Sequence, residues 1–236
     1  MRIILVAVAL GAAGSARAEE GVPSSSPAWR PWLPQPAMVG PARGRLEIVA
    51  GRGVSGGLAQ ASAEVTVGRG WSISGGAQVT EDGSRPRGGV AWQARAPIRD
   101  RIGVRLSLAY RPEGFVEPEG EVEAAVALSR RLGAGAGALA VTYGQDPEGR
   151  ERDAEVALAL GRPIAARFAV GAVVQGRRAL GTRLDDERRW DALATGVGAV
   201  RVDGARLELA LGGELLARRT DRVAGARVTA GVGYDW

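Results

Sequence analysis

The feature that most constrains the fold is a two-residue alternation of apolar residues with polar or very small ones, which runs from Gly44 to Trp236. A period of two places the two sets on opposite faces of a β-strand. Gly, Pro or charge clusters interrupt it roughly every 10 to 20 residues, and no segment shows a convincing helical period. We therefore predict an all-β domain of about twelve strands, with ten as the alternative. The expected strands are 44–52, 58–68, 71–80, 87–97, 101–111, 119–131, 133–143, 151–162, 165–177, 189–202, 205–218 and 224–236.

The second face of each expected strand separates a membrane barrel from a water-soluble sheet, because one apolar face is common to both. In segment 119–131 an apolar face alternates with a charged one: Val122, Ala124, Val126 and Leu128 against Glu119, Glu121, Glu123 and Ser129. Lipid would accept the first set, and a wet or salt-bridged interior the second. A soluble periplasmic all-β protein remains the weaker alternative.

The lengths of the connections also alternate. Tight links such as Arg69-Gly70 and Leu132-Gly133 are followed by longer polar ones such as 112–118 and 178–188, although the first and last links are both fairly short. Short periplasmic turns and longer outer loops predict this alternation. Because backbone groups in lipid need internal partners, the first and last strands must pair. We therefore expect a closed antiparallel transmembrane β-barrel with meander topology.

Aromatic residues fall at the ends of the expected strands, on the apolar face, where amphipathic rings favour the membrane interface. Trp92, in the middle of its expected strand, is the exception. The expected aromatic girdles comprise Trp71, Phe168, Tyr234 and Trp236 at the periplasmic rim, and Tyr110, Tyr143 and Trp190 at the outer rim.

The N-terminal 43 residues have a different composition. Residues 1–18 have a basic start, an apolar core and the cleavage pattern Ala16-Arg17-Ala18, which predicts a secretory signal peptide. Residues 19–43 are rich in Pro and Ser and predict a periplasmic leader. Its Trp29 and Trp32 could anchor at a membrane interface or enter the barrel mouth, or the leader could be disordered. The barrel domain is then 44–236.

The end of the chain, VTAGVGYDW, resembles the closing strand of bacterial outer-membrane β-barrel proteins, with alternating apolar residues and a terminal aromatic residue. That family often ends in Phe, where this chain has Trp. The resemblance implies a location in the outer membrane, contact with its lipid and lipopolysaccharide, and recognition by the barrel-assembly machinery. The implied assembly signal is Val228, Ala230, Val232, Tyr234 and Trp236. The subfamily and the oligomeric state are left open.

Residues suited to catalysis are scarce. The chain has no His, Lys or Cys, so the common bases for a Ser nucleophile and the thiol chemistries are missing. Gly53-Val54-Ser55-Gly56-Gly57 fits a nucleophile-elbow pattern but lies in a Gly-rich hairpin. Asp185-Asp186-Glu187 adjoins several Arg residues, which favours a solvated loop over a cation site. We expect no enzymatic activity, no catalytic residues, no metal site and no cofactor. Interleaved rather than clustered charges argue against nucleic-acid binding.

The residues expected to line the interior are the best functional lead. They are Arg87, Arg95, Arg101 and Arg105, and opposite them Glu119, Glu121, Glu123, Glu151, Asp153 and Glu155. An Arg wall facing an acidic wall predicts a small passive channel for polar solutes. The alternative is a non-conducting structural or surface-interaction barrel in which these charges pair, because a barrel of this size can be filled or open.

Overall fold

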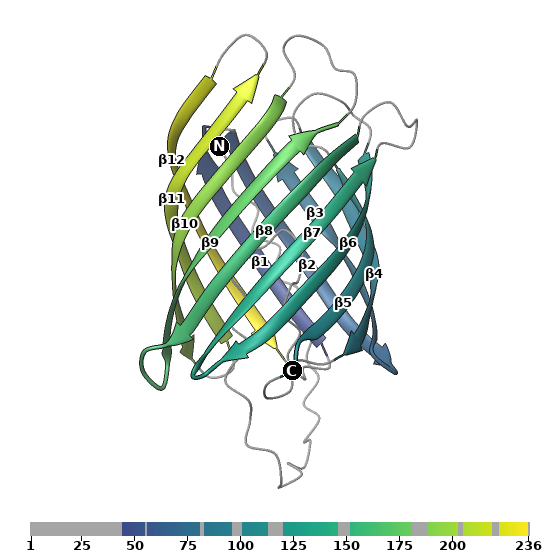
Figure 1. Cartoon of the computed structure of the whole chain (residues 1–236), viewed down its shortest axis with the longest axis vertical. Coiled ribbons are helices and arrows are strands. Elements are labelled where there is room, and N and C mark those ends of the chain that lie inside the picture. Colours follow the sequence, from purple (N-terminus) through teal and green to yellow (C-terminus); the bar gives the residue numbers. More distant parts are fainter. Residues whose placement is uncertain are drawn as a thin grey trace, which may run out of the picture.

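A computed structural model describes residues 44–54, 56–80, 83–95, 101–112, 120–145, 152–180, 188–202, 205–218 and 222–235. Within these ranges the chain forms twelve β-strands (Figure 1). No helix long and apolar enough to cross a membrane occurs among these residues. The strands are β1 Gly44–Gly53, β2 Gly56–Gly68, β3 Trp71–Thr80, β4 Gly83–Arg95, β5 Gly103–Pro112, β6 Gly120–Leu132, β7 Gly135–Gln145, β8 Arg152–Pro163, β9 Phe168–Ala179, β10 Arg188–Val202, β11 Ala205–Arg218 and β12 Arg222–Asp235.

The strands form one closed antiparallel barrel in which each pairs with its neighbours in sequence. The last seam joins β1 to β12, from Arg45 opposite Asp235 to Arg52 opposite Val228. The expected closed meander is confirmed, with twelve strands rather than ten. The signal peptide and leader predicted at 1–43 lie outside the described residues. We call the end where β1 begins and β12 ends the terminal mouth, and the other end the loop mouth (Figure 1).

The two largest differences from the predicted strand boundaries are at the starts of β9 and β4. β9 begins at Phe168 rather than 165, because 164–167 form a turn in which the Ile164 N–H donates to the Phe168 carbonyl at 2.9 Å. β4 begins at Gly83 rather than 87, although Pro86 lies inside the added part. Pro86 is opposite Ala77 of β3, while the pairing of β4 with β5 starts only at Gly88. Pro86 therefore lies where β4 has a partner strand on one side only, and such edge positions are where a sheet tolerates proline.

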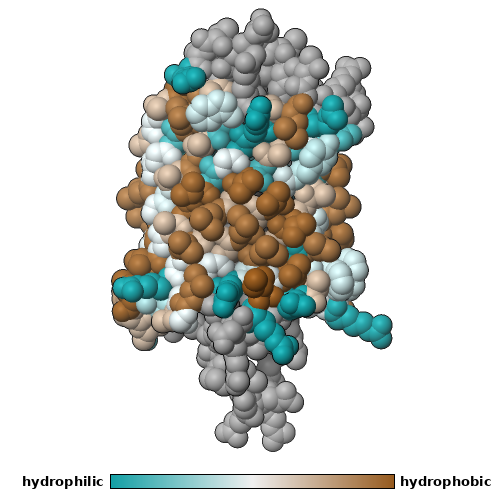
Figure 2. Space-filling model, in the orientation of Figure 1, coloured by the Kyte–Doolittle hydropathy of each residue, from teal (hydrophilic) through white to brown (hydrophobic). Residues whose placement is uncertain are grey.

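The apolar face of each strand looks outward. Leu106, Val126 and Val232 are 40%, 45% and 47% exposed, while their sequence neighbours Arg105, Ala125 and Gly233 are buried. Figure 2 shows apolar side chains gathered in a band around the middle of the visible face, with polar side chains above and below it. This is the surface that a hydrocarbon layer solvates.

One glycine of β11 is required by a close approach of the next strand. A Cβ at Gly212 would collide with the Ala194 carbonyl and the Thr195 side chain of β10, whereas a Cβ at Gly213 would meet nothing within 4 Å. We expect Gly212→Ala to lower the free energy of unfolding by about 1–3 kcal/mol, because the backbone must shift. Gly213→Ala is the matched control, expected within about 0.5 kcal/mol of the parent. Denaturant titration in lipid vesicles measures both, and equal losses would contradict the contact.

Candidate functional site: the barrel interior

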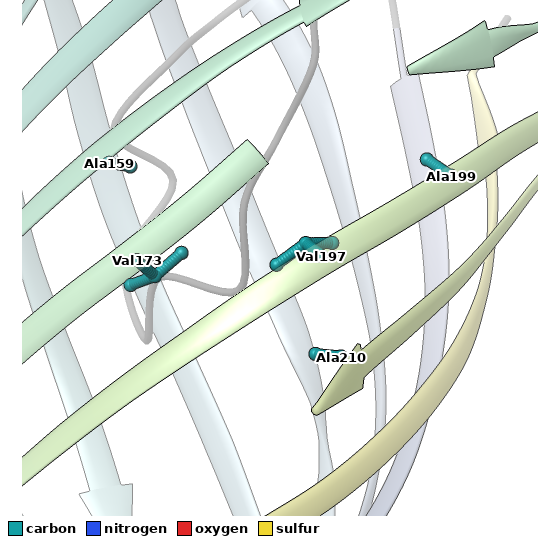
Figure 3. Packing of buried hydrophobic residues seen from close by; sticks show 5 residues of the cluster. All are labelled: Ala159, Val173, Val197, Ala199 and Ala210. Atoms are coloured by element: carbon teal, nitrogen blue, oxygen red, sulfur yellow. The ribbon is translucent and has the colours of Figure 1, made fainter. Parts of the chain in front are cut away.

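The inward side chains follow from the strand register and form two unlike walls. The wall of β1–β5, called here the polar wall, is lined mainly by residues with hydrogen-bonding side chains: Glu47, Gln60, Ser62, Glu64, Ser72, Ser74, Gln93, Arg105 and Ser107. The wall of β6–β11, called here the apolar wall, is lined over its middle mainly by small apolar residues, with Thr142, Gln175 and Thr195 among them. The apolar members are Ala125, Ala127, Ala138, Ala140, Ala157, Ala159, Val173, Val197, Ala199 and Ala210. Figure 3 shows five of these on β8 to β11.

An ion-pair cluster lies towards the terminal mouth. Arg105 of β5 donates through Nη2 to Glu64 Oε1 of β2 at 2.9 Å, and to Ser72 Oγ of β3 at 3.2 Å. The arginine therefore reaches past β4 along the inner surface. The side chains of Arg105 and Glu64 are 5% and 13% exposed, so this pair is shielded from bulk solvent.

A second arginine extends the cluster over the seam. Arg206 of β11 pairs with Glu208 on its own strand and reaches over β12 to Glu47 of β1, with Nη2 to Oε1 at 3.4 Å. Gly233 of β12 leaves room for this path, because a Cβ there would lie 2.8 Å from Arg206 Nη2. A residue with a side chain at this position would have to displace the guanidinium.

Two further ion pairs lie nearer the loop mouth. Arg177 of β9 pairs with Asp153 of β8 through both Nε and Nη2. Arg227 Nη1 of β12 lies 3.0 Å from Glu214 Oε1 of β11. Each pair joins adjacent strands, so these four charges are compensated locally.

Some of the predicted lumen residues point inward in the structure, whereas others are exposed or lie outside the described residues. Arg105, Glu123, Asp153 and Glu155 are buried and point inward, and Arg87 is inward and half-buried. Arg95 follows a register shift that sets it opposite Val104, and its side chain is exposed; Arg101 precedes β5 and is exposed. Glu121 is opposite Arg111, with neither side chain described, and Glu119 and Glu151 lie outside the described residues.

The sequence prediction missed several charged residues of the interior: Glu47, Glu64, Arg177, Arg206, Glu208 and Glu214. Strand parity was the available signal, since all of them except Arg177, which precedes the exposed Arg178, alternate with outward apolar or glycine neighbours. The expectation rested instead on strands with several like charges. With these residues included, the described ion pairs bring Arg and carboxylate together within each region of the interior.

The aromatic residues occupy both rims. Trp71, Phe168 and Tyr234 are exposed near the terminal mouth, and Tyr110 and Tyr143 near the loop mouth. Trp190, near the start of β10, is half-buried, and Trp236 lies outside the described residues. Trp92 is not mid-strand, because β4 ends at Arg95; it is opposite Trp71 and stacks on it with ring centroids 6.1 Å apart. It therefore belongs with the rim of the terminal mouth.

The described ranges contain no group of three or more His, Cys, Asp or Glu side chains placed to hold a metal ion. The acidic run Asp185-Asp186-Glu187, considered above as a cation site, lies outside the described residues. The residues predicted to form an assembly signal, Val228, Ala230, Val232 and Tyr234, lie on the outward face of β12, while Trp236 is not described.

No protein-family model and no curated protein matches the chain. Solved structures do. NanC porin is 14% identical, with 81% of this chain and 100% of that chain covered and a TM-score of 0.60. KdgM porin is 7% identical, with 81% and 99% covered and a TM-score of 0.61, and it has also been solved in complex with disordered oligogalacturonate. At these identities the likeness shows the fold alone, and the chain shares with both porins the fold of a closed antiparallel β-barrel.

Proposed function

We propose that the barrel is a narrow passive channel for small polar solutes, with an interior of mixed Arg and Glu charge. The observation that supports this most is the polar wall of β1–β5, since hydrogen-bonding side chains inside an apolar shell allow water to line the axis. The similarity in fold to two porins, each covered over 99% or more of its length, agrees with this role.

The pairing of the inner charges bears on which solutes would pass. KdgM porin has been solved with oligogalacturonate, a polyanion. A polyanion is best attracted by a surface with excess positive charge. Here Arg105, Arg177, Arg206 and Arg227 each contact a carboxylate. We therefore favour small neutral or zwitterionic solutes over long acidic chains.

Planar-bilayer recording tests the channel. Folded protein, identified by heat-modifiable gel mobility, should show unitary conductance with weak preference between cations and anions. Glu214→Gln should shift the reversal potential towards anion selectivity, because it leaves Arg227 unneutralised at a pair separated by 3.0 Å. Arg227→Gln is the matched opposite and should favour cations. If folded protein shows no unitary conductance, the channel is excluded.

A specific contact favours the second candidate, a non-conducting structural or surface-interaction barrel. The shielded pair between Arg105 and Glu64 joins strands that are not neighbours, and such pairs fill the inside of closed barrels. In that case folded protein would be silent in bilayers, and deletion of loops 112–118 or 178–188 would alter surface interactions. Contact with lipopolysaccharide, the barrel-assembly machinery, signal cleavage after Ala18 and the absence of enzymatic activity remain predictions.

A further inference from the structure

The charged residues on the outside of the barrel are arginines. Among the side chains that the structure describes, every carboxylate is buried or half-buried, whereas arginines are exposed at both ends. Figure 2 shows long hydrophilic side chains along the lower edge of the visible face, at the terminal mouth. The exposed arginines of this mouth, called here the basic collar, are Arg69, Arg95, Arg101, Arg130, Arg162 and Arg167. Within the described ranges no collar guanidinium forms an ion pair.

The connections at this mouth add little negative charge by their sequence. Segments 69–70, 96–102, 133–134 and 164–167 contain Asp100 as their one acidic residue. The collar therefore gives the rim between β2 and β9 an excess of positive charge.

The first arc of the collar consists of Arg69, Arg95 and Arg101, around the ends of β2 to β5. The backbone N–H of Gln93 donates to the Gly70 carbonyl at 2.7 Å, which holds the turn with Arg69 beside the end of β4. The Gln93 side chain donates to the Val104 carbonyl at 3.0 Å, at the register shift that precedes Arg95. Such irregularities redirect side chains, and this one leaves Arg95 exposed.

The backbone of Arg69 points to a role for its side chain outside the turn. Its φ of 48° lies in the left-handed region, where Gly, Asn and Asp are the favoured residues. The turn itself therefore gives no reason for an arginine, whereas its exposed guanidinium adds to the charge of the rim.

The second arc consists of Arg130, Arg162 and Arg167. Arg130 of β6 and Arg162 of β8 share the outward face of their strands with exposed leucines, so both extend from the outer surface and not from the interior. Arg167 lies in the turn before β9, directly beside the exposed Phe168.

The chemistry around the collar has two parts that meet at the rim. A guanidinium binds phosphate oxygens through two parallel N–H donors. The aromatic rings of Trp71, Trp92 and Phe168 mark the depth of lipid headgroups, and the apolar band begins beside them. A ligand with a phosphate at one end and an apolar chain at the other matches both parts.

We infer that the basic collar binds the phosphate groups of anionic phospholipids in the leaflet that surrounds the terminal mouth. The guanidiniums contact the phosphates, while the acyl chains of the same lipids cover the apolar band. This inference rests on insertion of the barrel in a membrane and not on the channel, since a non-conducting barrel has the same outer surface.

Quenching of tryptophan fluorescence by brominated phospholipids tests the first arc, because the stacked pair Trp71 and Trp92 lies beside it. The pair becomes the reporter in the full-length variant Trp29→Phe/Trp32→Phe/Trp190→Phe/Trp236→Phe. The folded protein is placed in phosphatidylcholine vesicles that contain the same minor fraction of either brominated phosphatidylglycerol or brominated phosphatidylcholine. An arginine at the membrane surface favours an adjacent anionic lipid roughly fivefold, so we expect brominated phosphatidylglycerol to quench at least about twice as much.

Two matched variants locate the effect on the collar. In the reporter background, Arg69→Gln/Arg95→Gln/Arg101→Gln should abolish the excess quenching by phosphatidylglycerol. Arg130→Gln/Arg162→Gln/Arg167→Gln removes the same charge from the second arc and should leave the excess at this pair unchanged.

The second arc has its own reporter, Phe168→Trp with every other tryptophan replaced by phenylalanine. At that position the two triple variants should exchange their effects, because Phe168 adjoins Arg167.

The outcomes separate the collar from membrane insertion and from the channel, for protein that is folded by heat-modifiable mobility. Equal quenching of the parent by the two brominated lipids would overturn the collar and leave the channel standing; free phosphate as the sole ligand would give this result. Excess quenching that survives in the first-arc variant would also overturn it. Absence of quenching by either lipid would overturn membrane insertion itself. Arg95→Gln/Arg101→Gln, which keeps the turn residue Arg69, should still reduce the excess if the triple variant does not fold.

Discussion

An arginine in place of Val126 is expected to lower the free energy of unfolding in a bilayer by about 2–4 kcal/mol. Val126 lies at the centre of β6, faces outward and is 45% exposed, between the outward residues Leu106 and Val141 of the neighbouring strands. A guanidinium there meets hydrocarbon rather than water. Urea titration of the protein folded into phospholipid vesicles, followed by tryptophan fluorescence, measures the loss.

Leu132→Arg provides the control for depth. Leu132 is on the same strand and faces the same way, but it ends β6 at the terminal mouth, where an arginine can extend into the headgroup region. Its expected cost is about 0–1 kcal/mol. Similar losses for Val126→Arg and Leu132→Arg would mean that the outward band does not lie in the hydrocarbon layer.

Glu64→Gln is expected to lower the free energy of unfolding by about 3 kcal/mol, since it leaves the guanidinium of Arg105 shielded without its carboxylate. The bond from Arg105 to Ser72 at 3.2 Å remains but carries no compensating charge. The same vesicle titration measures this loss.

The control for this pair removes both charges. Glu64→Met/Arg105→Met deletes the ion pair without leaving a shielded charge, and we expect it to recover most of the stability lost in Glu64→Gln. If Glu64→Gln and the double variant lose the same stability, the loss in Glu64→Gln does not arise from a guanidinium left without its carboxylate. A loss below about 0.5 kcal/mol in Glu64→Gln would show that water solvates Arg105 freely.

The sequence predicted the barrel well because lipid imposes the same demand on every strand. Outward residues such as Leu106 and Val232 must be apolar, and strand parity then assigns their neighbours to the inside. Closure was predictable for the same reason, since unpaired edges are not tolerated in lipid. Local exceptions were less visible. The register shift between Gln93 and Arg95 reverses the side of one arginine, and alternation does not signal such a shift.

The organisation of the interior was predicted less well, for two physical reasons. The partner of Arg105 is on a strand that is not adjacent, so the pairing depends on barrel radius and strand tilt rather than on neighbouring residues. The apolar wall was missed because alanines such as Ala138 and Ala159 were grouped with very small residues that suit either environment. Their grouping is visible only once the strands are assembled, as one cluster on β6 and β7 and another on β8 to β11.

The junction of β1 with β12 also governs the order in which the molecule is made. Every other strand pair is a hairpin between consecutive segments, whereas this one unites opposite ends of the domain. Contacts so distant along the chain are expected to form late, because closing a long loop costs entropy. Until β1 and β12 pair, the free edge of each strand carries backbone N–H and C=O groups that acyl chains cannot solvate. Entry into the bilayer and completion of the ring are therefore one coupled event. The ion pair between Arg206 and Glu47 reaches over β12 to β1, so it can form only after these two strands have paired. It then opposes separation of β1 from β12.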